Sequence, residues 1–225
     1  MVFSYDEHSG AELLYLDGDL FRHIFLSRRA KLGDRFLFRN LKDPFVYEYE
    51  AESIDKKGAK LLLVSKTKDE SDEKKERVSI AWCVVDPKIV EKTIPFLNEL
   101  GVDDLYFIYS SRSQKNFKID LERIERIAIN SCSQCGRNLL MNIVIFESLE
   151  RFCDDINDFC VLDFGGEAIQ KEDKKIWLIG PEGGFSEREQ EFLKHKNIKK
   201  ISFKTKNILR SETAAVAAAS LLAEL

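Results

Sequence analysis

The sequence lacks the features that mark several large classes of protein. No segment approaches the roughly 18 to 20 consecutive apolar residues that cross a bilayer, and the N-terminus has no basic stretch followed by an apolar one. No Gly-x-Gly-x-x-Gly follows a strand-like run, and no phosphate loop ending in Gly-Lys-Ser/Thr occurs. We therefore expect a cytoplasmic protein without a membrane partner, and we disfavour both the common dinucleotide-binding fold and a P-loop NTPase.

Histidine and cysteine are scarce, which argues against a metal centre. The chain has three histidines, and its five cysteines are an odd number in a chain too large to depend on disulfides, so we expect reduced thiols. Cys132 and Cys135 have the spacing of a redox or zinc pair, but a zinc site needs two further ligands close by. We interpret the pair as buried cysteines of a helix and predict no bound metal.

The net charge of −4 does not point to a nucleic-acid partner, but the distribution of charge does. Residues 21–42 hold seven basic side chains and one acidic one, and residues 194–210 hold seven basic side chains and no acidic one. Arginine dominates the first segment, and its guanidinium group binds phosphate through two parallel N–H groups. Both segments indicate local phosphate binding, with a solvated lysine face as the alternative for the second.

The first third of the chain has the pattern of a small β-barrel. Short apolar or alternating runs separated by turn residues predict strands at residues 12–16, 35–38, 47–51 and 60–64. Residues 68–77 contain no apolar side chain, which predicts a linker or, alternatively, the tip of a polar hairpin.

The remainder of the chain alternates strand-like runs with longer amphipathic runs. Strands are predicted at residues 78–85, 105–109, 143–146, 160–164, 176–179 and 200–203, and helices through 94–97 and at 119–135, 187–196 and 214–225. Alternation of this kind predicts an α/β domain with a mostly parallel sheet flanked by helices.

Two glycine- and alanine-rich segments near the C-terminus are the strongest functional signal. They read Ile-Gly-Pro-Glu-Gly-Gly-Phe-Ser at residues 179–186 and Ile-Leu-Arg-Ser-Glu-Thr-Ala-Ala at residues 208–215, each between a predicted strand and a predicted helix. Ser186 and Glu189 match a capping box, which places the start of a helix there. Bare backbone groups beside a helix start hold a polar small molecule with little side-chain obstruction. The segments predict a cofactor pocket, with a tight turn and ordinary alanine helix propensity as the alternatives.

These two segments resemble the C-terminal signatures of the bacterial 16S ribosomal RNA (uracil-N3)-methyltransferases, a family of the SPOUT superfamily. The central residues 99–103, 111–113 and 133–137 are similar to that family as well. Near the N-terminus, residues 23–29 followed by Gly33 and Asp34 resemble the family's small RNA-binding barrel. The resemblance therefore spans nearly the whole chain.

The resemblance implies a fold and a cofactor. The fold is α/β, with a C-terminal SPOUT-type trefoil-knotted domain at residues 71–225 and a small N-terminal PUA-like β-barrel at residues 1–70. The cofactor is S-adenosyl-L-methionine, held by three loops of the knot, with apolar walls for adenine and small polar partners for the ribose and the carboxylate. The implied cofactor-binding residues are Leu162, Gly165, Ile179, Gly180, Gly183, Gly184, Phe203, Ile208, Leu209, Ser211, Thr213 and Ala214.

The implied reaction is methylation of N3 of a specific uridine in 16S rRNA. Uracil N3 must lose a proton, and the charge that develops on the ring oxygens calls for a cation or an N–H donor. Arg210 is the first candidate for that role and Arg112 the second, while Glu182 is the nearest candidate carboxylate, with bracing of its loop as the alternative. RNA contacts are expected from Arg22, His23, Arg28, Arg29, Arg35 and Arg137.

The expected partner is 16S rRNA or the small ribosomal subunit, and the resemblance implies a homodimer. Two other functions stay open. One is a knotted methyltransferase that acts on another RNA, for example at a ribose 2′-oxygen, and the other is a non-catalytic RNA-binding ribosome-assembly factor that has kept the fold. Product analysis separates the first from N3 methylation, and cofactor binding tests the second.

Overall fold

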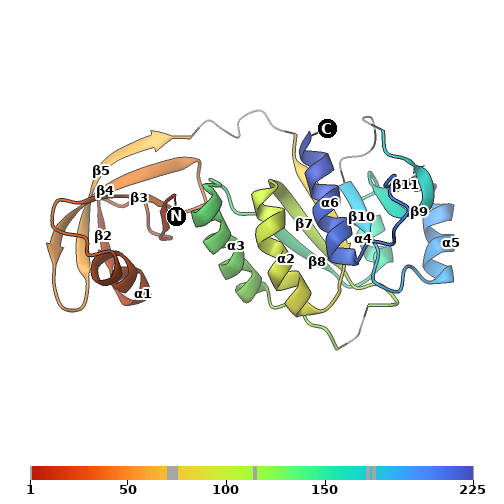
Figure 1. Ribbon diagram of the computed structural model, residues 1–225, viewed down its shortest axis with the longest axis horizontal. Helices are drawn as coiled ribbons and strands as arrows, with labels where there is room; N and C mark the ends of the chain where they lie inside the picture. The colour runs from red at the N-terminus through yellow and green to blue at the C-terminus, as the bar shows by residue number, and fades with distance from the viewer. Residues whose placement is uncertain (1, 70–75, 114–115, 171–172, 174–175, 225) are drawn as a thin grey trace. The chain divides into compact units, whose positions relative to one another are not determined.

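The computed structural model describes residues 2–69, 76–113, 116–170, 173 and 176–224, and the chain divides into two compact units (Figure 1). The first comprises Met1–Lys75 and Ile129–Leu140, and the second comprises Glu76–Ala128 and Met141–Leu225. Residues 70–75, which hold most of the predicted linker, lie outside the described residues. Lys68 was wrongly included in that linker, because it is the last residue of a strand.

The first unit is built on a curled, half-barrel sheet of five strands. In spatial order these are β1 (Ser4–Tyr5), β3 (Arg35–Arg39), β4 (Phe45–Ile54), β5 (Ala59–Lys68) and β2 (Leu13–Leu16). β1 pairs with β3 in parallel, and the other pairs are antiparallel. The four predicted strands are confirmed, with β4 and β5 longer than their apolar patterns indicate.

Two elements of the first unit have no clear periodic signal in the sequence. They are the short helix α1 (Gly18–Phe21) and the π-helical segment η1 (Arg22–Ser27) that continues it. Their buried side chains Phe21, Ile24 and Phe25 pack on the inward-facing residues of the sheet, such as Leu16 and Leu61. This core leaves the basic side chains of η1 on the surface.

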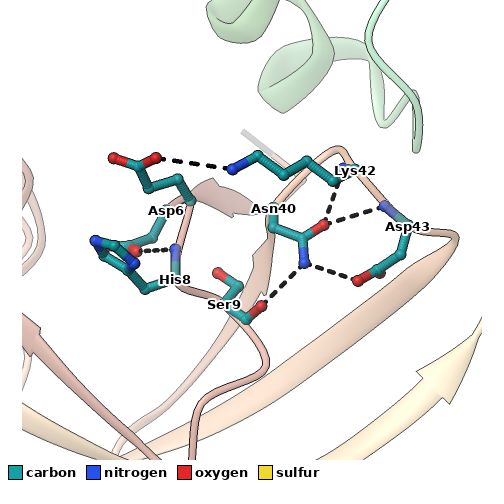
Figure 2. A network of polar contacts seen from close by, with 7 residues as sticks. Asp6, His8, Ser9, Asn40, Lys42 and Asp43 are labelled. Carbon is teal, nitrogen blue, oxygen red and sulfur yellow. Dashed lines mark hydrogen bonds and ion pairs between the residues drawn. The ribbon is translucent and has the colours of Figure 1, made fainter.

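A polar network closes the turn between β3 and β4, as Figure 2 shows. The Asn40 side-chain amide donates to the carbonyl oxygen of Ser9 at 3.0 Å and to the carboxylate of Asp43 at 2.7 Å. The Asn40 side-chain oxygen accepts the backbone N–H groups of Lys42 and Asp43. The buried amide therefore uses its donors and its acceptor, and it fixes the N-terminal segment against the turn.

The second unit is built on a six-stranded sheet in which neighbouring strands pair in parallel. In spatial order these are β11 (Lys200–Ser202), β9 (Cys160–Ala168), β10 (Ile176–Ile179), β6 (Val78–Cys83), β7 (Val102–Ile108) and β8 (Asn142–Phe146). The predicted parallel sheet of an α/β fold is confirmed.

The helices that follow these strands are α2 (Pro87–Glu99), α3 (Leu121–Cys135), α4 (Leu149–Asp155), α5 (Glu187–His195) and α6 (Ser211–Glu224). α2 and α6 contact each other, and α6 also contacts β6 and β10, so both helices lie along the sheet (Figure 1). The sequence pattern missed α4, because seven residues are too few to show a helical period. None of the helices in the described part of the chain is long and apolar enough to span a membrane.

Asp104 joins three strands at the amino-terminal end of the parallel sheet. Arg77 donates to its carboxylate through Nε and Nη2 at 2.9 Å each, and the amide of Asn142 and the hydroxyl of Ser79 donate at 3.0 Å and 3.1 Å. Burial favours a higher pKa for Asp104, but the Arg77 and Asn142 hydrogen bonds and the Arg77 charge outweigh it and hold the pKa below its usual value. The carboxylate is therefore ionised at neutral pH.

We expect Asp104→Asn to lower the free energy of unfolding at pH 7 by about 1.5 to 3 kcal/mol, because hydrogen bonds to an ionised group are lost. The folded-state pKa lies below the unfolded value of about 3.9, so this stabilisation is complete above about pH 5 and is lost as the pH falls through the folded pKa. Urea unfolding at pH 7 and pH 3 should show a difference that shrinks at the lower pH. Glu99→Gln, at an exposed carboxylate, is the control, and an equal difference at both pH values would contradict the assignment.

Candidate active site

A cavity of about 570 Å³ lies beyond the carboxyl ends of β10 and β11 and against the middle of β9. This is the edge at which open α/β sheets bind their ligands. Both glycine- and alanine-rich segments, 179–186 and 208–215, contribute to its walls. Of the predicted cofactor-binding residues, the cavity is lined by Leu162, Ile179, Gly180, Gly184, Phe203, Ile208, Leu209, Ser211 and Ala214.

Three predicted cofactor-binding residues lie away from the cavity wall. Gly165 belongs to β9, which continues to Ala168 and does not end at residue 164 as predicted. Thr213 is exposed on α6, and Gly183 is exposed between Glu182 and Gly184, both of which line the cavity. Which backbone and side-chain atoms face the cavity depends on the three-dimensional course of the chain, which the sequence motif does not give.

Two glycines shape the turn between β10 and α5. Gly184 has a φ of 66°, in the left-handed region that favours glycine, and its N–H donates to the carbonyl oxygen of Pro181 at 2.8 Å. A Cβ on Gly180 would lie 3.1 Å from the ring of Phe185, which is buried. The turn therefore needs glycine at one position for its conformation and at the other for close packing.

Ser211, the first residue of α6, links the two segments through its hydroxyl. The buried indole Nε1–H of Trp82 donates to Ser211 Oγ at 2.7 Å, and the Ser211 hydroxyl donates to the carbonyl oxygen of Gly180 at 3.0 Å. The proton of this hydroxyl is thus already engaged. Ser211 positions the wall of the cavity through these two bonds, and its contact with a bound cofactor stays a prediction.

Arg210 and Glu212 flank Ser211 and both line the cavity. The Arg210 side chain is 83% exposed, and its Nη1 lies 4.0 Å from Glu212 Oε1. Glu212 Oε2 is buried, and it has no hydrogen-bond partner among the residues that the structure describes. The pair offers a ligand one largely exposed cation and one unsatisfied acceptor.

Asp163 also lines the cavity, although neither sequence motif includes it. Its carboxylate accepts from Lys200 Nζ at 2.9 Å and from the backbone N–H of Phe164 at 2.9 Å. An acidic residue directly after the apolar run 160–162 is the signal that could have indicated it, because polar residues that follow buried strands of α/β folds often face the ligand edge.

Arg112 lies beside this cavity, although it does not line it. Its Nη1 donates to the carbonyl oxygen of Gly183, the exposed residue between two lining positions. The turn that carries Arg112 is closed by Ser110 and Ser113, whose hydroxyl oxygens lie 3.0 Å apart. The structure thus brings all three candidate catalytic residues, Arg210, Arg112 and Glu182, to the glycine-rich turn or the cavity beside it.

Glu189 caps α5 as predicted. Ser186 Oγ accepts the backbone N–H of Glu189, and the Glu189 carboxylate accepts the backbone N–H of Ser186, so the capping box is confirmed. Burial favours a higher pKa for Glu189, but the N–H groups of Ser111 and Ser186 and the Ser186 hydroxyl together lower it below its usual value. The carboxylate is ionised throughout the neutral range.

Gly166 allows β11 to approach β9. A Cβ at this position would lie 2.6 Å from the carbonyl carbon and 2.8 Å from the nitrogen of Ile201, and both of those atoms are backbone. The last residue of β11, Ser202, lines the cavity together with Phe203, which follows it. The glycine therefore supports one wall of the cavity.

We expect Gly166→Ala to cost about 1 to 3 kcal/mol of stability through overpacking and to weaken ligand binding in the cavity. The matched control is Gly165→Ala, where a Cβ meets no atom of the described residues within 4 Å and the φ of 75° is unfavourable, at about 1 kcal/mol. Thermal unfolding of both variants tests this. A Gly166→Ala protein no less stable than Gly165→Ala would contradict it.

The predicted RNA-binding side chains all belong to the first unit. His23, Arg28 and Arg29 are exposed, Arg22 pairs with Asp19, and Arg35 pairs with Glu48 and Glu50. Arg137 follows α3 and is partly exposed. Whether these side chains contact RNA stays a prediction.

In the folded protein, acidic side chains from elsewhere in the sequence pair with several lysines of the second basic segment, 194–210. Lys196, Lys199 and Lys200 pair with Asp154, Asp173 and Asp163, acids from other parts of the second unit. The fold therefore neutralises part of this segment, which weakens its interpretation as a phosphate-binding patch.

Four of the five cysteines are buried. Cys132 is buried as predicted, but Cys135 is exposed because it ends α3. Burial raises the pKa of Cys153 to about 12 and raises that of Cys83 as well, so both thiols stay protonated. Within the described residues, no group of three or more His, Cys, Asp and Glu side chains is placed to hold a metal ion.

Comparison with known proteins gives three findings of similarity. Residues 72–223 match the model of a family described as an RNA methyltransferase domain. The chain is 39% identical over 226 residues to ribosomal RNA small subunit methyltransferase E of Helicobacter pylori, a match that covers 98% of this chain and 99% of the relative. A third finding concerns solved structures of the same fold.

Two of those structures contain a bound cofactor. A putative methyltransferase of Legionella pneumophila, in complex with the cofactor SAM, has a TM-score of 0.79 at 24% identity and covers 98% of this chain and 95% of its own. Ribosomal RNA small subunit methyltransferase E of Neisseria gonorrhoeae, bound to S-adenosyl methionine, has a TM-score of 0.78 at 20% identity, with coverage of 99% and 96%. At these identities the likeness concerns the fold.

Proposed function

The chain belongs to the ribosomal RNA small subunit methyltransferase E family, and from this membership we propose that it transfers a methyl group from S-adenosyl-L-methionine to N3 of a uridine in 16S rRNA. The observation that carries the proposal is the meeting of residues 179–186 and 208–215 in the walls of one cavity. These are the segments on which the sequence resemblance depends. An assembly factor without catalysis would have no need to retain both.

The residues of the cavity fit this cofactor. Its volume of about 570 Å³ lies within the range of roughly 300 to 1,000 Å³ usual for small-molecule sites. Leu162, Ile179 and Leu209 offer apolar walls for the adenine, and the carboxylates of Asp163 and Glu212 offer acceptors for hydroxyl and ammonium groups. The buried Oε2 of Glu212, which has no hydrogen-bond partner in the described part of the chain, supports a ligand that brings a donor or a positive charge.

Bound S-adenosyl-L-methionine supplies an electrophilic methyl group, so the protein has to align the uracil and stabilise the charge that loss of the N3 proton leaves on the ring oxygens. Arg210 is suited to that stabilisation because it lines the cavity and its guanidinium group is largely exposed. Arg112 is suited to assist from the adjoining turn. Because N3 lies on the pairing edge, the substrate uridine must be unpaired or extruded.

The wider arrangement is part of the same proposal. Residues 71–225 act as a SPOUT methyltransferase domain whose cofactor loops form a trefoil knot. Residues 1–70 act as a PUA-like barrel that binds the rRNA around the target uridine. The exposed His23, Arg28 and Arg29 support this RNA contact. We further propose a cytoplasmic homodimer whose partner is the small ribosomal subunit.

Nucleoside mass spectrometry tests the reaction directly. The protein is incubated with labelled S-adenosyl-L-methionine and small ribosomal subunits that lack the modification, and the RNA is then digested and analysed. Labelled 3-methyluridine is the expected product. Label on a ribose or on another base would overturn the N3 assignment, and the absence of both transfer and cofactor binding would overturn the enzymatic function in favour of an assembly factor.

A further inference from the structure

Glu189 makes a contact that helix capping does not require. A capping box needs the hydrogen bonds between Glu189 and Ser186. In this protein Glu189 Oε1 also accepts the backbone N–H of Ser111 at 2.7 Å, while Oε2 accepts the N–H and the hydroxyl of Ser186 at 2.8 Å each. One carboxylate therefore binds two loops that are far apart in the sequence.

The two loops are those that carry the glycine-rich turn and Arg112. Ser186 ends the turn at residues 180–186, and Ser111 directly precedes Arg112 in the loop after β7. Arg112 in turn donates to the carbonyl oxygen of Gly183. The two loops are thus joined at two points, by the buried Glu189 carboxylate and by the exposed Arg112 guanidinium group.

The two contacts differ in how firmly they fix the position of the Arg112 loop. Arg112 is a long, exposed side chain with many rotamers, and one hydrogen bond fixes it poorly. Glu189 is 3% exposed and accepts three donors, so it fixes the backbone from which Arg112 projects. The turn within residues 110–113 is itself closed, because Ser113 N–H donates to the Ser110 carbonyl oxygen at 3.0 Å.

We propose that Glu189 is a positioning residue for methyl transfer, a latch that holds the Arg112 loop beside the glycine-rich turn so that the Arg112 guanidinium group faces the substrate base. This proposal rests on the proposed function. It assigns Glu189 an effect on turnover that passes through Arg112, in addition to its capping of α5.

Glutamine is the informative replacement at position 189. It keeps the size of the side chain, but an amide has one accepting oxygen and one NH₂ group, whereas the groups of Ser111 and Ser186 that bind the Glu189 carboxylate are donors. One of the two loops must then face a donor and separate from the latch. The matched control is Glu187→Gln, which removes an exposed carboxylate from the same first turn of α5.

Hydrogen exchange tests the latch without reference to activity. In the full-length protein, the backbone amide that faces the glutamine NH₂ group, that of Ser111 or that of Ser186, should exchange at least about tenfold faster in Glu189→Gln than in wild type or Glu187→Gln, because its acceptor is lost. Calorimetry should show that the Kd for S-adenosyl-L-methionine changes by less than about twofold, since Glu189 does not line the cavity. Unchanged exchange at both Ser111 and Ser186 would overturn the proposal.

A double-mutant cycle tests the route through Arg112. We expect Glu189→Gln to lower kcat on small ribosomal subunits about tenfold in the wild-type background and less than about twofold in an Arg112→Ala background. Equal losses in both backgrounds would show that Glu189 acts independently of Arg112 and would overturn the proposal. A wild-type protein that transfers no methyl group would instead overturn the proposed function, and the exchange result would still report whether the two loops are latched.

Discussion

Replacement of Arg210 by alanine is expected to slow methyl transfer to small ribosomal subunits by about a hundredfold to a thousandfold, the usual effect of removing one donor that stabilises developing negative charge. Arg210 lines the cavity, and its side chain is 83% exposed. Stability should change little, because the contact of its guanidinium group with Glu212 is a distant one at 4.0 Å. Single-turnover kinetics at saturating cofactor measure the effect on the chemical step.

The control for Arg210→Ala is Lys206→Ala. Lys206 is an exposed cation of the same loop that does not line the cavity, so its loss removes a similar charge without removing the proposed donor. Both variants should lower RNA affinity slightly and reduce its salt dependence. If Arg210→Ala turned over like Lys206→Ala, the charge-stabilising role of Arg210 would be wrong.

Most of the sheet and much of the cavity could be predicted from the sequence because they follow from local patterns. β6 and β10 are short apolar runs, and the capping box at Ser186 marks the start of α5 one residue before it begins. The glycine-rich turn and the start of α6 carry their motifs within a few residues. Nine of the twelve predicted cofactor-binding positions consequently line the cavity.

The remaining features depend on contacts between distant segments, which no local pattern encodes. The hydroxyl of Ser211 is engaged by Trp82, 129 positions away, and the carboxylate of Glu189 reaches Ser111, 78 positions away. Asp163 and Lys200 are 37 positions apart, and their ion pair reduces the charge of a run that looks uniformly basic in the sequence. The residue types and motifs indicate candidate functional side chains, but the role of each side chain depends on the partners that the fold brings to it.

The end of β9 is a feature of the backbone that the local sequence pattern also does not predict. Gly165 and Gly166 are typical of a loop, and the sequence therefore predicts a strand that ends near residue 164. The structure continues the strand to Ala168, because Gly166 lets β11 pair closely beside it. A glycine that permits close packing and a glycine that permits a turn are indistinguishable until the neighbouring strand is known.

We expect Ser211→Ala to lower the free energy of unfolding by about 1 to 3 kcal/mol, because it leaves the indole N–H of the fully buried Trp82 without its acceptor. It also removes the hydrogen bond to Gly180, which holds the glycine-rich turn against α6. We therefore expect the Kd for S-adenosyl-L-methionine to rise about tenfold, which corresponds to about 1.4 kcal/mol of binding free energy. Thermal unfolding and calorimetry measure the two effects, and Ser220→Ala on the exposed face of α6 is the control.

Trp82→Phe separates the two consequences of losing the Ser211 hydroxyl. In the double variant no indole N–H remains to be satisfied, so the loss of stability should be smaller than the sum of the two single losses, with a coupling of about 0.5 to 3 kcal/mol. The weakened cofactor binding should persist, because the hydrogen bond to Gly180 is still absent. Strictly additive stabilities would show that the Trp82 contact contributes nothing, and a cofactor affinity restored by Trp82→Phe would show that Ser211 acts on the cavity through the indole and not through the turn.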